Sequence, residues 1–159
     1  MKKMRFYLET SVWNFLVSDE ISDKQLATKR FFEEVKLKGY QIYISPLVVI
    51  EIERTKQVDV INRLRDVLLR YQPELLEELP DVLLLSEKYC KEGIIPEKYR
   101  NDAIHIAYVS LYELDSIISW NLRHIVKMKT RRLVNYINLL EGYRSIELVT
   151  PEEVIEDER

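Results

Sequence analysis

The sequence predicts a three-layer α/β/α sandwich with a mainly parallel central sheet, and two observations support this prediction. Segments typical of strands alternate with segments typical of helices along the whole chain. The strand-like segments are short apolar runs without a clean polar face, as in strands that are covered on both sides. With 159 residues, 47% of them hydrophobic and 32% charged, the chain suits one folded domain.

Strands and helices alternate in the first half of the chain. Residues 4–8 have the alternating pattern of a strand, and a helix follows at Glu9-Thr10-Ser11, whose hydroxyl groups are good helix caps. Apolar spacing predicts a helix over 23–38 that Gly39 terminates. The next predicted elements are a strand at 41–44, a helix from Leu47 to about Thr55 that Ser45 and Pro46 open, and a helix from Val60 to Tyr71.

The second half continues this alternation. Residues 74–79 fit either a short strand or the start of a helix, and Pro80 opens a helix that ends near Gly93. A helix begins at Asn101, or one residue earlier, and extends through Leu114. The last predicted elements are a strand at 115–119, a helix at 132–141, a strand at 146–149 and a capped turn at 150–152. We assign 1–150 to one domain and 151–159 to an acidic tail.

Composition excludes several classes of protein. The three glycines are isolated, so the chain has no Gly-rich loop for phosphates, which excludes P-loop NTPases and the common dinucleotide fingerprint. The single cysteine, Cys90, permits no internal disulfide and cannot make a zinc site alone. No apolar run approaches the roughly 20 residues of a membrane helix, and the N-terminus has no signal-peptide pattern. We therefore expect a cytoplasmic protein without membrane contact.

The net charge of −3 is unevenly distributed, because residues 152–159 contain five acids and one base. In contrast, residues 123–132 contain five bases and no acid: Arg123, Lys127, Lys129, Arg131 and Arg132. A solvated surface is the plain interpretation of this basic stretch. The alternatives are a surface that binds a nucleic-acid backbone or one that docks an acidic partner.

Four polar residues lie where strands end or where a following helix begins. Glu9 ends the first strand, and Glu51 lies about two turns into the helix after the second. Asp102 opens a helix, and Asn121 ends the strand that begins at Asp115. Each alone is more often a solvated or capping group. Because sites in parallel sheets form at the carboxyl ends of strands, we expect these four side chains to meet.

Carboxylates that meet in one crevice repel each other and offer only oxygen ligands. A hard divalent cation resolves this repulsion, so we predict that Glu9, Glu51 and Asp102 bind Mg²⁺ or Mn²⁺. His105, three residues after Asp102, is also a candidate ligand. We prefer packing or hydrogen bonding near the site as the interpretation of this histidine.

Four blocks of the sequence resemble, in order and spacing, the four motif blocks of PIN domains. They are FYLETSVW at 6–13, ISPLVVIEI at 44–52, NDAIHIA at 101–107 and SWNLRHI at 119–125. The resemblance covers nearly the whole chain. PIN domains are small α/β/α metal-dependent ribonucleases, and they include the VapC-type toxins of bacterial and archaeal toxin–antitoxin pairs.

This resemblance implies a metal-dependent ribonuclease that hydrolyses single-stranded RNA to 5′-phosphate and 3′-hydroxyl ends and acts as the toxin of such a pair. The implied catalytic residues are Glu9, Glu51, Asp102 and Asn121. The candidate substrate-binding residues are Thr10, Ser11, Arg123, Lys127, Arg131 and Arg132. We expect an RNA substrate, a small antitoxin protein and a second copy of the chain in a homodimer as partners.

The chain departs from the family pattern at two positions. Glu9 replaces the usual aspartate and is one methylene longer, and His124 stands where many relatives have a further acid. Asn121 is within the family's range, and we interpret Asp115, at the opposite end of its strand, as structural. The departures keep open a catalytically silent PIN-fold module that binds RNA or protein. A phosphatase or receiver domain is disfavoured, because no aspartate follows a strand as nucleophile or phosphoacceptor.

Overall fold

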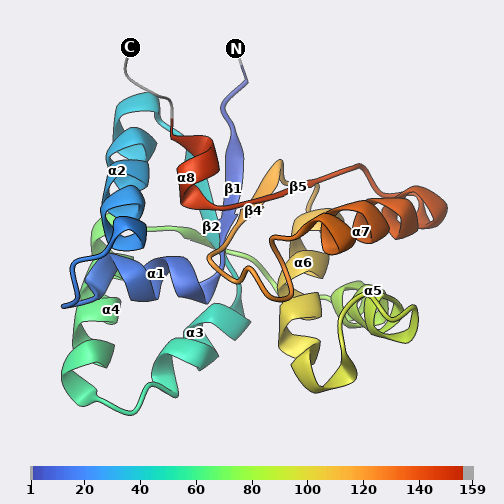
Figure 1. The fold of residues 1–159 in the computed structure, drawn as a ribbon, viewed down its shortest axis with the longest axis horizontal. Helices are drawn as coiled ribbons and strands as arrows, with labels where there is room; N and C mark the ends of the chain where they lie inside the picture. Colours follow the sequence, from blue (N-terminus) through green and yellow to red (C-terminus); the bar gives the residue numbers. More distant parts are fainter. Residues whose placement is uncertain (1, 156–159) are drawn as a thin grey trace.

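The computed structural model describes residues 2–155 and has a five-stranded sheet at its centre (Figure 1). The strands are β1 (Arg5–Leu8), β2 (Gln41–Ile44), β3 (Glu74–Leu75), β4 (Ser116–Ile118) and β5 (Glu147–Val149). Their order is β3-β2-β1-β4-β5, and every neighbouring pair is parallel. The predicted parallel α/β/α architecture is therefore confirmed.

Helices cover both faces of the sheet. They are α1 (Thr10–Val17), α2 (Asp23–Lys38), α3 (Pro46–Glu53), α4 (Val58–Tyr71), α5 (Pro80–Lys91), α6 (Arg100–Leu111), α7 (Met128–Glu141) and α8 (Pro151–Val154), with a short 3₁₀ helix, η1 (Glu97–Tyr99), before α6. Figure 1 shows α1 to α4 on one side of the sheet and α5 to α7 on the other. This division follows from the strand order, because the chain moves outward from β1 in one direction to β3 and then in the other from β4 to β5.

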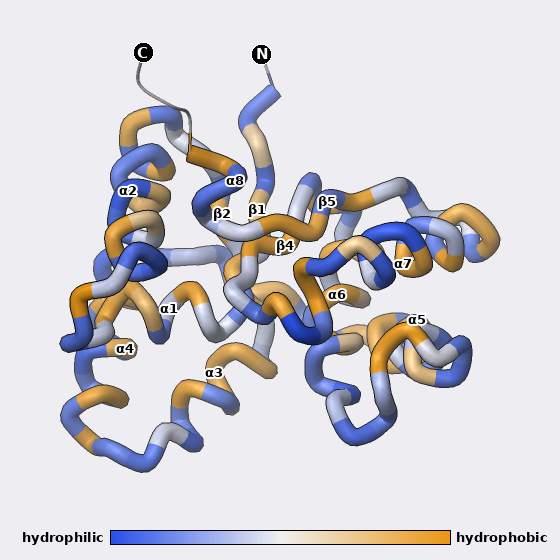
Figure 2. The backbone as a smooth tube through the Cα atoms, viewed as in Figure 1, coloured by the Kyte–Doolittle hydropathy of each residue, from blue (hydrophilic) through white to orange (hydrophobic). Residues whose placement is uncertain are grey.

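The core forms around the central strand. Phe6, Tyr7 and Leu8 of β1 are all buried, as are Ile117 and Ile118 of β4, because both faces of these strands are covered by helices. Figure 2 shows β4 and β5 as largely hydrophobic segments and α2, α4 and α7 as helices in which hydrophobic and hydrophilic residues alternate. Each helix thus buries one stripe against the sheet or a neighbouring helix.

Several predicted elements have different limits in the structure. The sixth helix ends at Leu111 and not at Leu114, because Glu113 has a left-handed backbone with a φ of 53°. The seventh helix begins at Met128, four residues before its predicted start at Arg132. In the ambiguous segment 74–79 only Glu74–Leu75 is a strand. The helix 23–38, its left-handed cap Gly39 and the strand 41–44 are confirmed with their predicted limits.

The C-terminal part of the described chain begins with a capping box. Thr150 accepts a hydrogen bond from the Glu153 backbone, and the Glu153 side chain accepts one from the Thr150 backbone. The short helix α8 packs against α2, and its first residue Pro151 is buried. Of the predicted acidic tail, residues 156–159 lie outside the described part. Within residues 2–155, no helix is both long and apolar enough to cross a membrane.

Candidate metal centre

The carboxyl ends of β1 and β4 define the candidate site. These strands are neighbours at the centre of the sheet, and the connections that follow them leave in opposite directions. Such a switch point leaves a crevice above the strand ends. Glu9 follows β1 directly, and Ser119 to Asn121 follow β4. Asp115, at the other end of β4, accepts a hydrogen bond from the Arg5 backbone at 2.7 Å, in agreement with its predicted structural role.

Glu9 is the N-cap of α1 and is 7% exposed. Its Oε2 accepts a hydrogen bond from the Ser11 backbone at 3.1 Å, and its Oε1 accepts from the hydroxyls of Ser11 and Ser119 at 2.6 Å each. The extra methylene lets the carboxylate fold back over the first turn of its own helix. The prediction that Thr10 or Ser11 caps this helix is therefore wrong, because both hydroxyls donate to carboxylates instead.

Glu51 lies on α3 and faces the crevice with its side chain 27% exposed. Its Oε1 accepts hydrogen bonds from the Thr10 hydroxyl and from Nε2 of His105, both at 2.6 Å. Burial alone would raise the pKa of Glu51. The hydrogen bond and charge of His105 outweigh this effect and, with the bond from Thr10, bring the pKa below its ordinary value.

His105 is fully buried on α6, and both of its ring nitrogens have partners. Nε2 contacts Glu51, and Nδ1 lies 2.6 Å from the Tyr7 hydroxyl. Burial would lower the pKa of His105, but the hydrogen bond and negative charge of Glu51 raise it above its usual value. The expectation that His105 makes hydrogen bonds near the site is confirmed.

The structure adds three residues to the site that sequence reasoning did not select: Tyr7, Ser45 and Ser119. Ser45 has the position of a helix cap, as predicted, but it makes no capping bond, because its hydroxyl lies 2.8 Å from that of Tyr7. A buried histidine among apolar residues needs polar partners, and this requirement was the one sequence signal for such residues.

Asp102 lies in the first turn of α6, beside the other acids. Burial raises its pKa from the ordinary 3.8 to about 6, and the charges of Glu9 and Glu51 act in the same direction. His105 and a hydrogen bond from Asn121 oppose this rise in pKa. The Asn121 amide oxygen also accepts from the His124 backbone at 2.9 Å, which fixes the turn after β4. The four predicted residues therefore converge on one crevice.

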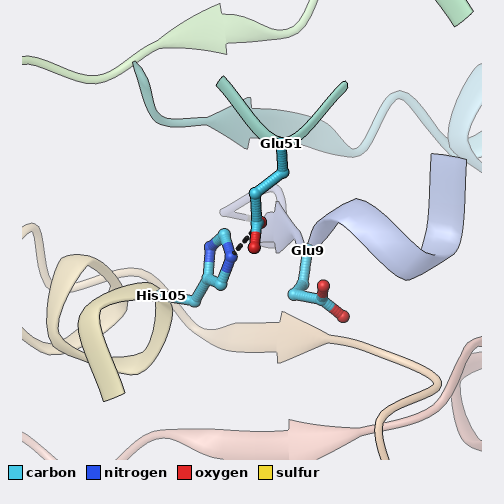
Figure 3. A group of neighbouring side chains, drawn as sticks. All are labelled: Glu9, Glu51 and His105. Carbon is cyan, nitrogen blue, oxygen red and sulfur yellow. Dashed lines mark hydrogen bonds and ion pairs between the residues drawn. The ribbon is translucent and has the colours of Figure 1, made fainter. Parts of the chain in front are cut away.

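The donor set suits a divalent cation. Glu9, Glu51 and His105 each offer a ligand atom, and these atoms lie within 4.8 Å of one another. Figure 3 shows their side chains approaching from the end of β1, from α3 and from α6, with His105 joined to Glu51. Asp102 lies close enough to raise or lower its neighbours' pKa values but is outside this group of three. Excess carboxylate oxygen favours Mg²⁺ or Mn²⁺ over softer metals.

The predicted basic stretch divides into two parts. Arg123, Lys127 and Arg132 are exposed, and the Arg123 guanidinium lies 5.8 Å from the centre of the Tyr99 ring, just before α6. Arg131 instead donates to the Leu148 carbonyl at 3.0 Å and pairs with Glu153 at 3.3 Å. It therefore links α7 to β5 and α8.

Comparison with known proteins supports the fold. No protein-family model matches the chain, and no curated protein matches its sequence. The structure is similar to a chain of VapBC2 from Rickettsia felis, solved bound to a DNA fragment from the promoter, with a TM-score of 0.59 and 13% identity over 92% of this chain and 98% of that chain. It is also similar to tyrosyl-tRNA synthetase from Archaeoglobus fulgidus in complex with L-tyrosine, with a TM-score of 0.50 and 14% identity over 94% of this chain and 55% of the synthetase chain. At these identities the likeness concerns the fold alone.

Proposed function

We propose that this protein is a metal-dependent ribonuclease that hydrolyses phosphodiester bonds of single-stranded RNA. The observation that carries the proposal is the convergence of Glu9, Glu51 and Asp102 at the switch point of a parallel sheet, with the pKa of Asp102 raised to about 6. Carboxylates held this close without a counter-ion repel each other, and a divalent cation relieves that repulsion. The sequence blocks that resemble PIN domains contain all three acids.

In this proposal the residues have separate tasks. Glu9, Glu51 and Asp102 would hold Mg²⁺ or Mn²⁺, directly or through water, and Asn121 would orient the attacking water or the scissile phosphate. Thr10 and His105 hold Glu51, while Ser11 and Ser119 hold Glu9. The bound cation supplies Lewis acidity, which activates water and offsets charge on the phosphate. The protein then needs no nucleophile of its own.

We assign the RNA backbone to the exposed bases that follow Asn121. Arg123 lies next to Tyr99, which directly precedes the helix that carries Asp102, so this cation is close to the acids. Lys127 and Arg132 continue the same basic stretch at the start of α7. Arg131 serves the fold and is left out of the surface. Thr10 and Ser11 stay candidates for a phosphate contact, although both already donate to carboxylates.

We further propose that the protein is the toxin of a toxin–antitoxin pair and acts in the cytoplasm, as a homodimer with a small antitoxin protein as its partner. The support is the resemblance to PIN domains, which include VapC-type toxins, together with the fold shared with a chain of VapBC2.

Cleavage of single-stranded RNA with added Mn²⁺ or Mg²⁺, and with EDTA, tests the activity. Cleavage should require the metal and stop in EDTA. Glu51→Gln, which keeps the shape of the side chain but removes its charge, should abolish cleavage, whereas Glu53→Gln on the exposed side of the same helix should not. Cleavage that persists in EDTA, or in the Glu51 variant, would refute the proposal.

One observation favours a second candidate, a catalytically silent module that binds RNA or protein. Both oxygens of Glu9 accept hydrogen bonds within the chain, so this carboxylate is already satisfied as a helix cap. A silent module would bind RNA in EDTA and leave it intact when Mn²⁺ is added. The cleavage assay therefore discriminates the two functions.

A further inference from the structure

A continuous chain of buried hydrogen bonds leads from the protein interior to Glu51. It runs from the Ser45 hydroxyl to the Tyr7 hydroxyl over 2.8 Å, and from there to Nδ1 of His105 over 2.6 Å. Nε2 of His105 then contacts Oε1 of Glu51 over 2.6 Å. Ser45, Tyr7 and His105 are each 0% exposed, so water does not compete for these groups. The chain joins β1, α6 and both ends of the segment from Ser45 to Glu51.

The chemistry of its last member fixes the direction of the whole chain. A carboxylate only accepts hydrogen bonds, so Nε2 of His105 must carry the hydrogen that it shares with Glu51. In the neutral ring, Nδ1 then accepts from the Tyr7 hydroxyl, and Tyr7 in turn accepts from Ser45. Every hydrogen in the chain therefore points toward Glu51.

The same geometry argues against His105 as a metal ligand. Both of its nitrogens are within hydrogen-bond distance of a partner, and the nitrogen nearest to Glu51 carries a hydrogen. A purely structural role explains why the polar groups are paired, but it does not explain their end point. Ser45 gives up the cap of α3 to take part, and the chain ends on the only carboxylate of that helix that belongs to the candidate centre.

The contacts of Glu51 also determine which oxygen remains available. Both side-chain hydrogen bonds to Glu51 within the described residues, from Thr10 and from His105, end on Oε1. Oε2 receives none of them. A carboxylate that is anchored through one oxygen keeps the other oriented and free for a ligand.

We propose that Ser45, Tyr7 and His105 are positioning residues that anchor Oε1 of Glu51 and thereby present Oε2 to a divalent cation. This inference rests on the metal centre of the proposed function and names the part of the chain that orders it. These three residues act through Glu51 and contact neither the cation nor the RNA.

The test compares two substitutions that each remove one buried tyrosine hydroxyl. Tyr7→Phe interrupts the chain, whereas Tyr89→Phe removes a hydroxyl that bonds to Ser110 at 3.0 Å and Asn138 at 2.5 Å in a separate buried cluster. Binding of Mn²⁺ to the metal-free proteins is measured by titration calorimetry. Tyr7→Phe should weaken binding by about tenfold, and Tyr89→Phe should leave it within about twofold of the wild type. Equal affinities for Tyr7→Phe and wild type would overturn the proposal.

A second readout needs no metal. The carboxyl ¹³C signal of Glu51 in the metal-free protein should move in Tyr7→Phe and in Ser45→Ala, which interrupts the chain one bond further away, and should stay in place in Tyr89→Phe. An unmoved signal in both chain variants refutes the positioning role. If the wild type binds no Mn²⁺, the metal centre is refuted instead, so the two failures are distinct.

Discussion

Replacing Asp102 by asparagine should stabilise the metal-free protein. Asp102 is partly buried beside Glu9 and Glu51, and this environment raises its pKa from the ordinary 3.8 to about 6. At neutral pH the folded protein therefore holds a charge that would be more favourable in the unfolded chain. Asparagine has nearly the same shape and no charge, so the variant removes this unfavourable term.

The magnitude follows from the two pKa values. A rise from 3.8 to about 6 corresponds to about 3 kcal/mol of lost stability when the pH is above both values. Because Asp102 is only partly buried, solvent screening leaves about half of this, or about 1.5 kcal/mol. The native state binds the proton more tightly than the unfolded state, so the stability lost to this group grows as the pH rises from about 4 to about 6.

Urea unfolding in EDTA measures this effect. At pH 7.5, Asp102→Asn should exceed the wild type in free energy of unfolding by about 1.5 kcal/mol, and at pH 4.5 the difference should fall to about half or less. Asp66→Asn, an exposed change on α4, serves as the control and should show no such pH dependence. A variant that is less stable than the wild type at pH 7.5 would refute the reasoning, as would a difference that does not change with pH.

Three further outcomes are expected at other positions. Glu9→Ala should lose Mn²⁺ binding in calorimetry and about 1 kcal/mol of stability with its helix cap, whereas Glu9→Asp should keep both; an alanine variant that binds Mn²⁺ normally would remove Glu9 from the centre. Changing Arg123, Lys127 and Arg132 to glutamine should raise KM for RNA, leave kcat unchanged and flatten the salt dependence by about 0.7 per lost contact, whereas an unchanged KM would favour an acidic protein partner for this stretch. Arg131→Gln should lower the thermal stability because it unties α7 from β5 and α8, and binding of RNA should change little.

Local patterns in the sequence were sufficient for most of the fold. The helix 23–38 and its glycine cap follow from apolar spacing and from the left-handed backbone that Gly39 adopts, and both depend on neighbours within a few residues. The start of α7 was predicted four residues late, because Met128 and Lys129 are exposed and give no apolar period from which to locate the first turn. Helix ends that lack a cap signal are poorly determined by sequence for this reason.

The candidate site was predictable only as a set of positions. The parallel sheet and the switch point implied that Glu9, Glu51, Asp102 and Asn121 would meet, because carboxyl ends of parallel strands share one edge. The sequence does not contain the direction in which each side chain points once it arrives. Glu9 could reach outward or fold back over its helix, and only packing against Ser119 decides that it folds back.

The sequence by itself thus determined the order of the elements, the architecture and the polar residues gathered at one edge of the sheet, since these depend on local periodicity and on rules of connection. The tertiary structure alone decided that Tyr7 and His105 join Glu51, although 98 residues separate the first two and 54 the last two. The raised pKa of Asp102 is likewise a product of burial and of neighbouring charges. Such contacts depend on distances of a few tenths of an ångström between residues remote in sequence, and those distances exist only after the layers have packed.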